Sequence, residues 1–205
     1  MLSRALTLIL LAAAPGLASA QVQDYRILGS PDAPVEMVIY SDFECPYCRN
    51  FALAALPAII AEFVHSGRLR IRYAYFPLAA IHTNSVAASK AAHCAGVVGR
   101  FWSFHDYLFV RQPEWSRATV PNSLWVRFAE NLGIDADEFA TCLASPETHD
   151  AVEEDLREAL GSGATGTPTV VLDGESVTGI SSYETLRQEI LDAIERAEGR
   201  TREPL

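Results

Sequence analysis

The pattern of apolar and polar positions predicts a β-strand in each of three short runs of the chain. The first run, 35–40, is apolar on both faces, which is typical of a strand in the centre of a sheet. The second run, 68–75, alternates arginine with apolar residues. The third run, 169–172, is followed by Asp-Gly and then by a short apolar stretch at 177–178, a pattern that predicts a β-hairpin.

The apolar spacing becomes helical over 46–65 and again over 183–198. Pro57 lies inside the first of these segments, where we expect it to kink the helix rather than end it. Because this helix joins the runs 35–40 and 68–75, the two strands are expected to be parallel, as in a βαβ unit.

The middle of the chain carries helix signals and no strand signal. Asn84, Asp135 and Ser145 precede helical spacing and are expected to cap three helices. Two more helices are predicted near 101–110 and 124–131. We interpret the fold as α/β, with a thioredoxin-like domain whose parts, 21–82 and 163–205, are separated by a helical subdomain inserted at 83–162.

The first residues, 1–20, are typical of a signal peptide, with a positive charge at Arg4, an apolar run and the small residues Ala18-Ser19-Ala20. Cleavage after Ala20 predicts a periplasmic or secreted protein in a compartment that permits disulfides. No later stretch reaches about 18 uncharged apolar residues, so a retained membrane anchor is not expected.

Loss of Arg4 changes the formal charge from −10 to −11. Such an acidic surface argues against nucleic acid as a partner.

Cys45-Pro46-Tyr47-Cys48 follows the first predicted strand and opens the helix 46–65. A sulfur at a helix N-terminus lies beside unpaired backbone N–H groups and the positive end of the helix dipole, and both favour the thiolate. Since the thiolate attacks disulfides, Cys45 is expected to be the nucleophile and Cys48 the resolving cysteine of a redox disulfide. Pro46 suits the first helical position.

A zinc site or a structural clip is the alternative interpretation of two cysteines three positions apart. Zinc usually takes four ligands, from two such pairs or from one pair with spaced histidines. The chain has no second CxxC, and its five histidines lack that spacing. We therefore predict a redox site and no metal.

Three elements together resemble the DsbA-like branch of the thioredoxin superfamily, the exported thiol-disulfide oxidoreductases. These elements are the motif 42–48 after a strand, the aromatic run 101–106 inside a helical insertion, and Gly166-Thr167-Pro168-Thr169 before a hairpin. The resemblance implies that Pro168 is cis and lies beside the Cys45 sulfur, and that Thr167 offers its backbone to an extended peptide. A trans proline that begins a strand is the lesser alternative for Pro168.

The resemblance implies an oxidase that works without a cofactor. It would introduce disulfides into reduced or unfolded secretory proteins, act as a monomer, and be reoxidised by a DsbB-like membrane protein. The exported reductase and isomerase branch, kept reduced by a membrane donor, fits the same motifs and stays open. The short segment before the first strand favours the oxidase. A copper-binding module using Cys45 and Cys48 is a third hypothesis.

Two positions depart from related patterns. Ile39 stands where several relatives have a buried acid, so water, Asp42 or Glu44 would have to take the proton of Cys48. Tyr47 stands where the strongest oxidants have histidine and cannot supply a positive charge. The pKa of Cys45 is therefore expected at roughly 4 to 6, with an intermediate redox potential.

Cys94 and Cys142 lie in the predicted insertion, and an exported compartment favours a structural disulfide between them. Two free thiols or a second electron-relay pair are the alternatives. His82 and His93 could flank the substrate groove, or could be core or capping groups. The aromatic residues of 102–109 are expected to belong to the core or to floor a peptide groove.

Overall fold

The computed structural model describes residues 24–177 and 183–202. The predicted signal peptide and Thr178 lie outside this range. Within it, five strands form one sheet in the order β1-β3-β2-β4-β5. The strands are β1 (Ile27–Leu28), β2 (Val35–Ser41), β3 (Leu69–Tyr75), β4 (Thr169–Leu172) and β5 (Glu175–Val177).

The pairing follows the sequence pattern closely. Strands β2 and β3 are parallel, and β4 and β5 form the predicted antiparallel hairpin. Strand β2 lies in the centre, paired with β3 on one side and antiparallel to β4 on the other. The short strand β1, antiparallel to β3, was not predicted. The expectation of a thioredoxin-like fold with a helical insertion is confirmed.

The helix after β2 is continuous from Pro46 to Val64, although its winding changes. Its α-helical parts are α1 (Pro46–Asn50) and α2 (Leu56–Ile59), and π-helical turns follow each of them. Pro57 lies in the first turn of α2, and the helix continues past it, as predicted.

By length and composition this helix could cross a membrane, with 19 residues and a mean hydropathy of 1.3 in its most apolar window. Its residues Leu56, Ile59 and Phe63 are nevertheless buried against the sheet. Two charged residues, Arg49 and Glu62, also interrupt it. We interpret it as the central core helix of the domain.

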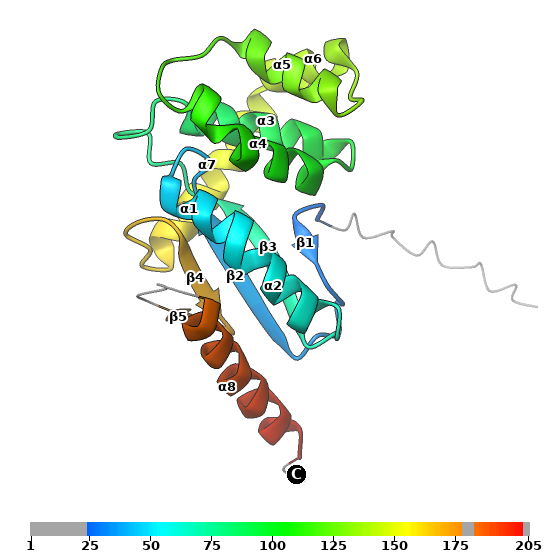
Figure 1. Ribbon diagram of the computed structural model, residues 1–205, viewed down its shortest axis with the longest axis vertical. Helices are drawn as coiled ribbons and strands as arrows, with labels where there is room; N and C mark the ends of the chain where they lie inside the picture. The colour runs from blue at the N-terminus through cyan, green and yellow to red at the C-terminus, as the bar shows by residue number, and fades with distance from the viewer. Residues whose placement is uncertain (1–23, 178–182, 203–205) are drawn as a thin grey trace, which may run out of the picture.

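Helices cover both faces of the sheet (Figure 1). The continuous helix 46–64 and α8 (Tyr183–Arg202) pack on the face formed by Met37, Ile39 and Ile71. Helix α7 (Pro146–Gly161) contributes Ala159 and Leu156 to a smaller cluster on the opposite face. The alternation of side chains along β2 thus buries both of its faces.

The helical subdomain contains α3 (Ser85–Val97), α4 (Phe101–Trp115), α5 (Asn122–Asn131) and α6 (Ala136–Ala144), and α7 returns the chain to the sheet (Figure 1). Its core is aromatic and includes the fully buried Phe104 and Phe109, while Trp102 is only partly buried. The same cluster includes Phe43, Cys45 and Cys48. The core of the insertion is therefore continuous with the CxxC motif.

Two local expectations in this subdomain were wrong. Helix α4 continues past the predicted end at Val110 and includes Pro113. Asn84 precedes α3, but its side chain does not cap that helix. Its amide donates instead to the carbonyls of Trp115 and Ala118, both at 2.9 Å, because the loop after α4 folds back over it.

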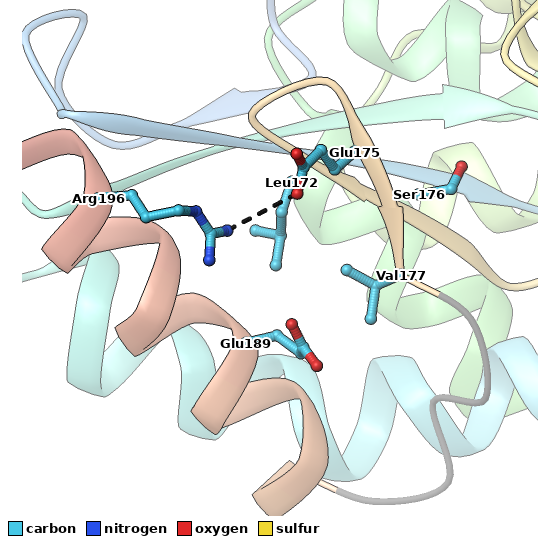
Figure 2. Close-up of a pocket in the computed structure, with 6 residues that line it drawn as sticks. All are labelled: Leu172, Glu175, Ser176, Val177, Glu189 and Arg196. Atoms are coloured by element: carbon cyan, nitrogen blue, oxygen red, sulfur yellow. Dashed lines mark ion pairs between the residues drawn. The ribbon is translucent and has the colours of Figure 1, made fainter. Parts of the chain in front are cut away.

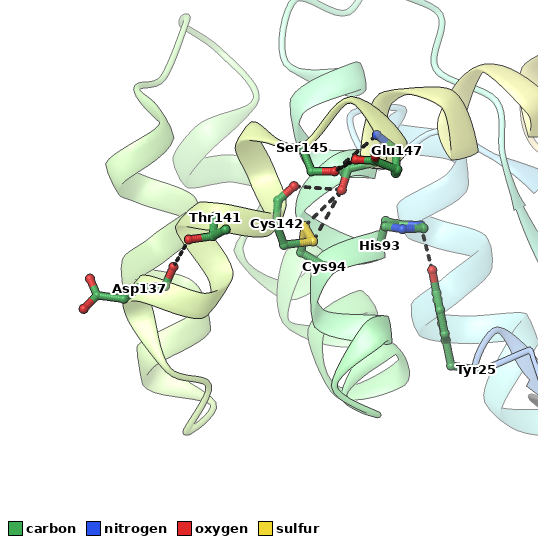
Figure 3. Close-up of a disulfide and its surroundings, with 9 residues drawn as sticks. Tyr25, His93, Cys94, Asp137, Thr141, Cys142, Ser145 and Glu147 are labelled. Carbon is green, nitrogen blue, oxygen red and sulfur yellow. Dashed lines mark hydrogen bonds between the residues drawn. A yellow bond between two sulfur atoms is a disulfide. The ribbon is translucent and has the colours of Figure 1, made fainter.

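Cys94 on α3 and Cys142 on α6 form a disulfide with a Cα–Cα distance of 5.7 Å (Figure 3). The Thr148 hydroxyl lies 3.4 Å from the Cys142 sulfur and 3.7 Å from the Cys94 sulfur, and donates to the Cys142 carbonyl. His93 lies one position before Cys94 and hydrogen-bonds the Tyr25 hydroxyl at 2.7 Å (Figure 3). The disulfide therefore ties the first helix of the subdomain to its fourth.

Candidate active site

Cys45 occupies the N-cap position of α1, with extended backbone angles, and Pro46 lies in the first turn. A turn delivers it there, since its N–H donates to the Asp42 carbonyl at 3.1 Å. Its side chain is 4% exposed, whereas Cys48 is 0% exposed. Tyr47, between them, is 72% exposed. Cys45 is therefore the less buried of the two cysteines.

The pKa of Cys45 is lowered to about 6. The largest cause is a hydrogen bond from the Cys48 thiol, which burial of the sulfur opposes. An interaction with Thr167 and the backbone N–H groups of Cys48 and Tyr47 lower it further. These N–H groups belong to the first turn of the helix, as the helix-terminus argument requires.

Absorbance titration of the thiolate in the reduced protein is expected to give a midpoint near 6 for Cys45. Because the folded pKa lies below the unfolded value, this group stabilises the reduced fold fully above the unfolded pKa of about 8.5, and the contribution disappears as the pH falls through 6. A midpoint above about 7.5 would contradict the proposed surroundings of the sulfur.

Cys48 has the opposite character. Burial raises its pKa well above the ordinary value, and its interaction with Cys45 raises it further. The backbone N–H of Asp42 donates to its sulfur at 3.5 Å. With Cys45 as the thiolate and Cys48 as the thiol, Cys45 is the sulfur that attacks first, and Cys48 reacts only in the second step.

The peptide bond between Thr167 and Pro168 is cis. The Cys45 thiol donates to the Thr167 carbonyl over a distance of 3.4 Å, so the two loops meet across the site. Strand β4 begins immediately after this proline, and Thr169 pairs with Tyr40 of β2. Neighbouring strands therefore deliver both the cysteine and the proline to the same edge of the sheet.

Gln112 of α4 is a site residue that sequence reasoning missed. It is 5% exposed, and its side-chain amide donates to the carbonyls of Phe43 at 2.8 Å and Cys45 at 3.0 Å. A second contact runs from α1 to α4, where the Arg49 guanidinium donates to the Phe109 carbonyl at 2.9 Å. The helical insertion thus holds the backbone of the motif in place, a contact with no local signal in the sequence.

Four polar residues near the motif form a further group. The buried Asp42 carboxylate contacts His82, with 2.8 Å between Oδ2 and Nδ1. The buried Glu44 carboxylate accepts the backbone N–H of Asn84 at 2.6 Å. Ile39, at the position of the acid in several relatives, is buried among apolar side chains. Of the groups that the sequence offered as proton acceptors for Cys48, only Asp42 directly contacts this sulfur, through its backbone.

A polar cavity lies elsewhere, between the β4–β5 hairpin and α8 (Figure 2). Glu175, Glu189 and Arg196 line it, and Arg196 pairs with Glu175 at 3.9 Å. No residue of the CxxC or cis-proline loops is among its lining residues. In the described part of the chain, no group of three or more histidine, cysteine or acidic side chains could hold a metal ion.

Two kinds of known protein resemble this chain in sequence. The Na⁺/H⁺ antiporter NhaA 3 of Salinispora tropica is 33% identical over 172 residues, which are 84% of this chain but 25% of the antiporter. The probable disulfide bond formation protein D of Bacillus anthracis is 28% identical over 149 residues, covering 72% of this chain and 69% of that protein. The chain spans only about a quarter of the length of the antiporters it matches.

In structure, oxidised BdbD from Bacillus subtilis matches with a TM-score of 0.76 at 22% identity, covering 85% of this chain and 95% of BdbD. This likeness shows a shared fold. The thioredoxin family model matches residues 21–193, most of the chain. The protein therefore belongs to the thioredoxin family and has the DsbA-like fold that its motifs predict.

Proposed function

We propose that this protein is an exported thiol-disulfide oxidoreductase that introduces disulfides into reduced or unfolded secretory proteins. One observation carries the proposal. The sulfur of Cys45 has a lowered pKa, belongs to the less buried cysteine of the pair, and lies 3.4 Å from the carbonyl that precedes a cis-proline. A stabilised thiolate and the backbone proposed to bind the substrate peptide thus lie at one site.

In the oxidative direction, a substrate thiolate attacks the Cys45 sulfur of the Cys45–Cys48 disulfide. The bond between the two cysteines breaks, Cys48 leaves and takes up a proton, and a mixed disulfide remains on Cys45. A second substrate thiolate then attacks the substrate sulfur of that mixed disulfide and releases Cys45 as a thiolate. The substrate dithiol loses two electrons and the protein disulfide gains them. The low pKa of Cys45 favours both the departure of its thiolate and an oxidising disulfide.

The backbone of Thr167 is the proposed anchor for the substrate chain. An extended peptide could pair with it as an added strand, which holds the reacting sulfur near Cys45 without reading a particular sequence. Residues 1–20, proposed as a signal peptide, would take the protein to the periplasm or outside the cell. A DsbB-like membrane protein would then reoxidise the cysteine pair of this proposed monomer.

The in-cell redox state of the pair tests the direction. Acid quenching followed by thiol alkylation should find Cys45 and Cys48 mostly oxidised, and the purified oxidised protein should oxidise a dithiol peptide. A mostly reduced pair would instead assign the protein to the reductase and isomerase branch. The neutral side chain of Tyr47 favours this second candidate, because it adds no positive charge that would stabilise the thiolate and make the disulfide more oxidising.

A Tyr47→His variant is expected to be a stronger oxidant than the wild type. Histidine at this exposed position places a partial positive charge near the Cys45 thiolate and should lower its pKa by about one unit, a factor of ten in the thiolate equilibrium. The equilibrium of the pair against glutathione measures the change, with Tyr47→Phe as the neutral control. An equal shift in both variants would show that the phenol, rather than charge, determines the difference.

A further inference from the structure

The pair formed by Asp42 and His82 leads from the interior of the molecule toward its surface. The Asp42 side chain is completely buried, whereas that of His82 is 17% exposed. The distance between their Oδ2 and Nδ1 atoms is 2.8 Å. The carboxylate is also held by the backbone N–H groups of Leu78 and Glu44, both at 2.8 Å. This buried acid therefore has a fixed position and a partner that reaches solvent.

The buried end of this pair adjoins the resolving cysteine. The N–H of Asp42 itself donates to the Cys48 sulfur, and the preceding Ser41, also buried, interacts with that sulfur through its hydroxyl. Cys48 has no exposed surface of its own. A proton that leaves or reaches this sulfur therefore needs a path through neighbouring protein groups.

We propose that Asp42 and His82 together form the route by which Cys48 exchanges its proton with solvent during thiol-disulfide exchange. The inference rests on the proposed function and deepens it, since it assigns a carrier to one step of that reaction. Asp42, whose backbone N–H contacts the sulfur, is the inner member, and His82 is a positioning and relay residue that acts through Asp42. The pair takes over the task that a buried acid at position 39 could have performed.

The protons balance in each direction of the reaction, with uptake by Cys48 in one and release in the other. When the Cys45–Cys48 disulfide opens, the leaving Cys48 sulfur receives a proton from the pair, which recovers one from solvent through His82. When Cys48 attacks the Cys45 sulfur of a mixed disulfide, its proton passes to the pair and the substrate leaves as a thiolate. No other oxidant or reductant is needed.

Glu44 is the competing carrier, because it too is a buried acid close to the motif. Burial raises its pKa, but its carboxylate is turned toward the backbone N–H and the side chain of Asn84, at 2.6 and 3.5 Å. These contacts connect Glu44 to the start of the helical subdomain rather than to Cys48. The geometry thus favours Asp42.

The test separates the two steps of one reaction. The reduced protein is mixed with glutathione disulfide, quenched with acid at successive times, alkylated and weighed by mass spectrometry. Cys45 first forms a glutathione adduct, and Cys48 then displaces glutathione to close the protein disulfide. In His82→Gln, adduct formation should proceed at the wild-type rate, while closure should slow about 100-fold, as expected for a lost acid-base group.

Further variants discriminate between the carriers. Asp42→Asn should slow closure at least as much as His82→Gln, and added imidazole should restore part of the closure rate in His82→Gly. Glu44→Gln should keep a closure rate within about threefold of the wild type, as should the exposed control His149→Gln. The unchanged adduct step reports in each case that the variant is folded.

Two results would overturn the inference. One is an unchanged closure rate in both His82→Gln and Asp42→Asn, and the other is a larger loss in Glu44→Gln than in either of them. Failure of the proposed function looks different, because the cysteine pair would then be mostly reduced in the cell, whatever the closure rates of these variants.

Discussion

Replacing Cys45 by serine is expected to reduce disulfide exchange on the order of 1,000-fold or more, to the level of the uncatalysed reaction. A serine hydroxyl is not ionised near neutral pH and cannot form a mixed disulfide. The fold should survive, since serine is a preferred N-cap residue and could satisfy the same N–H groups of the first turn. Oxidation of a dithiol peptide, followed by mass spectrometry, measures the loss.

The matched Cys48→Ser variant should behave in the opposite way. It keeps the Cys45 sulfur, so it still attacks substrate disulfides, but it lacks the thiol that resolves the product. Covalent complexes with exported proteins should therefore accumulate and disappear on reduction. Loss of the hydrogen bond from the Cys48 thiol, the largest cause of the lowered Cys45 pKa, should be partly offset because serine can donate too. Full turnover in either variant would defeat the mechanism.

Most of the fold was predictable because its buried segments repeat a local pattern. Strand β2 is apolar on both faces and lies in the centre of the sheet, as that pattern predicts. Strand β1 has only two residues, too few for any periodicity to show. It is held by contacts from far along the chain, since the adjacent Arg26 pairs with Asp155 of α7. Such a strand is visible only once its partners are placed.

The candidate site also has features that the local sequence predicts and features that depend on distant contacts. The spacing of Cys45 and Cys48 and the Thr167-Pro168 pair were visible in the sequence because each depends on its immediate neighbours. Gln112 was missed and the contact of His82 with Asp42 was not predicted, because these residues contact the motif from 67 and 40 positions away. Local capping logic also failed at Asn84 for this reason. A polar residue beside an apolar run does not reveal which distant backbone group it will satisfy.

The disulfide between Cys94 and Cys142 is expected to stabilise the protein by about 4 kcal/mol in the chain-entropy account, because it closes a loop of 48 residues in the unfolded chain. The sequence left this pair open between a structural bond, two free thiols and a relay. A structural role predicts a large effect on unfolding with little effect on exchange at Cys45. A relay predicts the reverse, since electrons would then have to pass through this pair.

The Cys45→Ser/Cys48→Ser double variant isolates the effect, because it retains only this pair among the four cysteines of the chain. Urea unfolding of that variant before and after reduction compares the same side chains with and without the covalent link. Reduction should lower the urea midpoint of this variant by the equivalent of about 4 kcal/mol in the free energy of unfolding. In the wild-type background, Cys94→Ala/Cys142→Ala should keep the adduct and closure rates of the active-site pair. A loss below about 1 kcal/mol, or slowed exchange in a stably folded Cys94→Ala/Cys142→Ala protein, would remove the structural assignment.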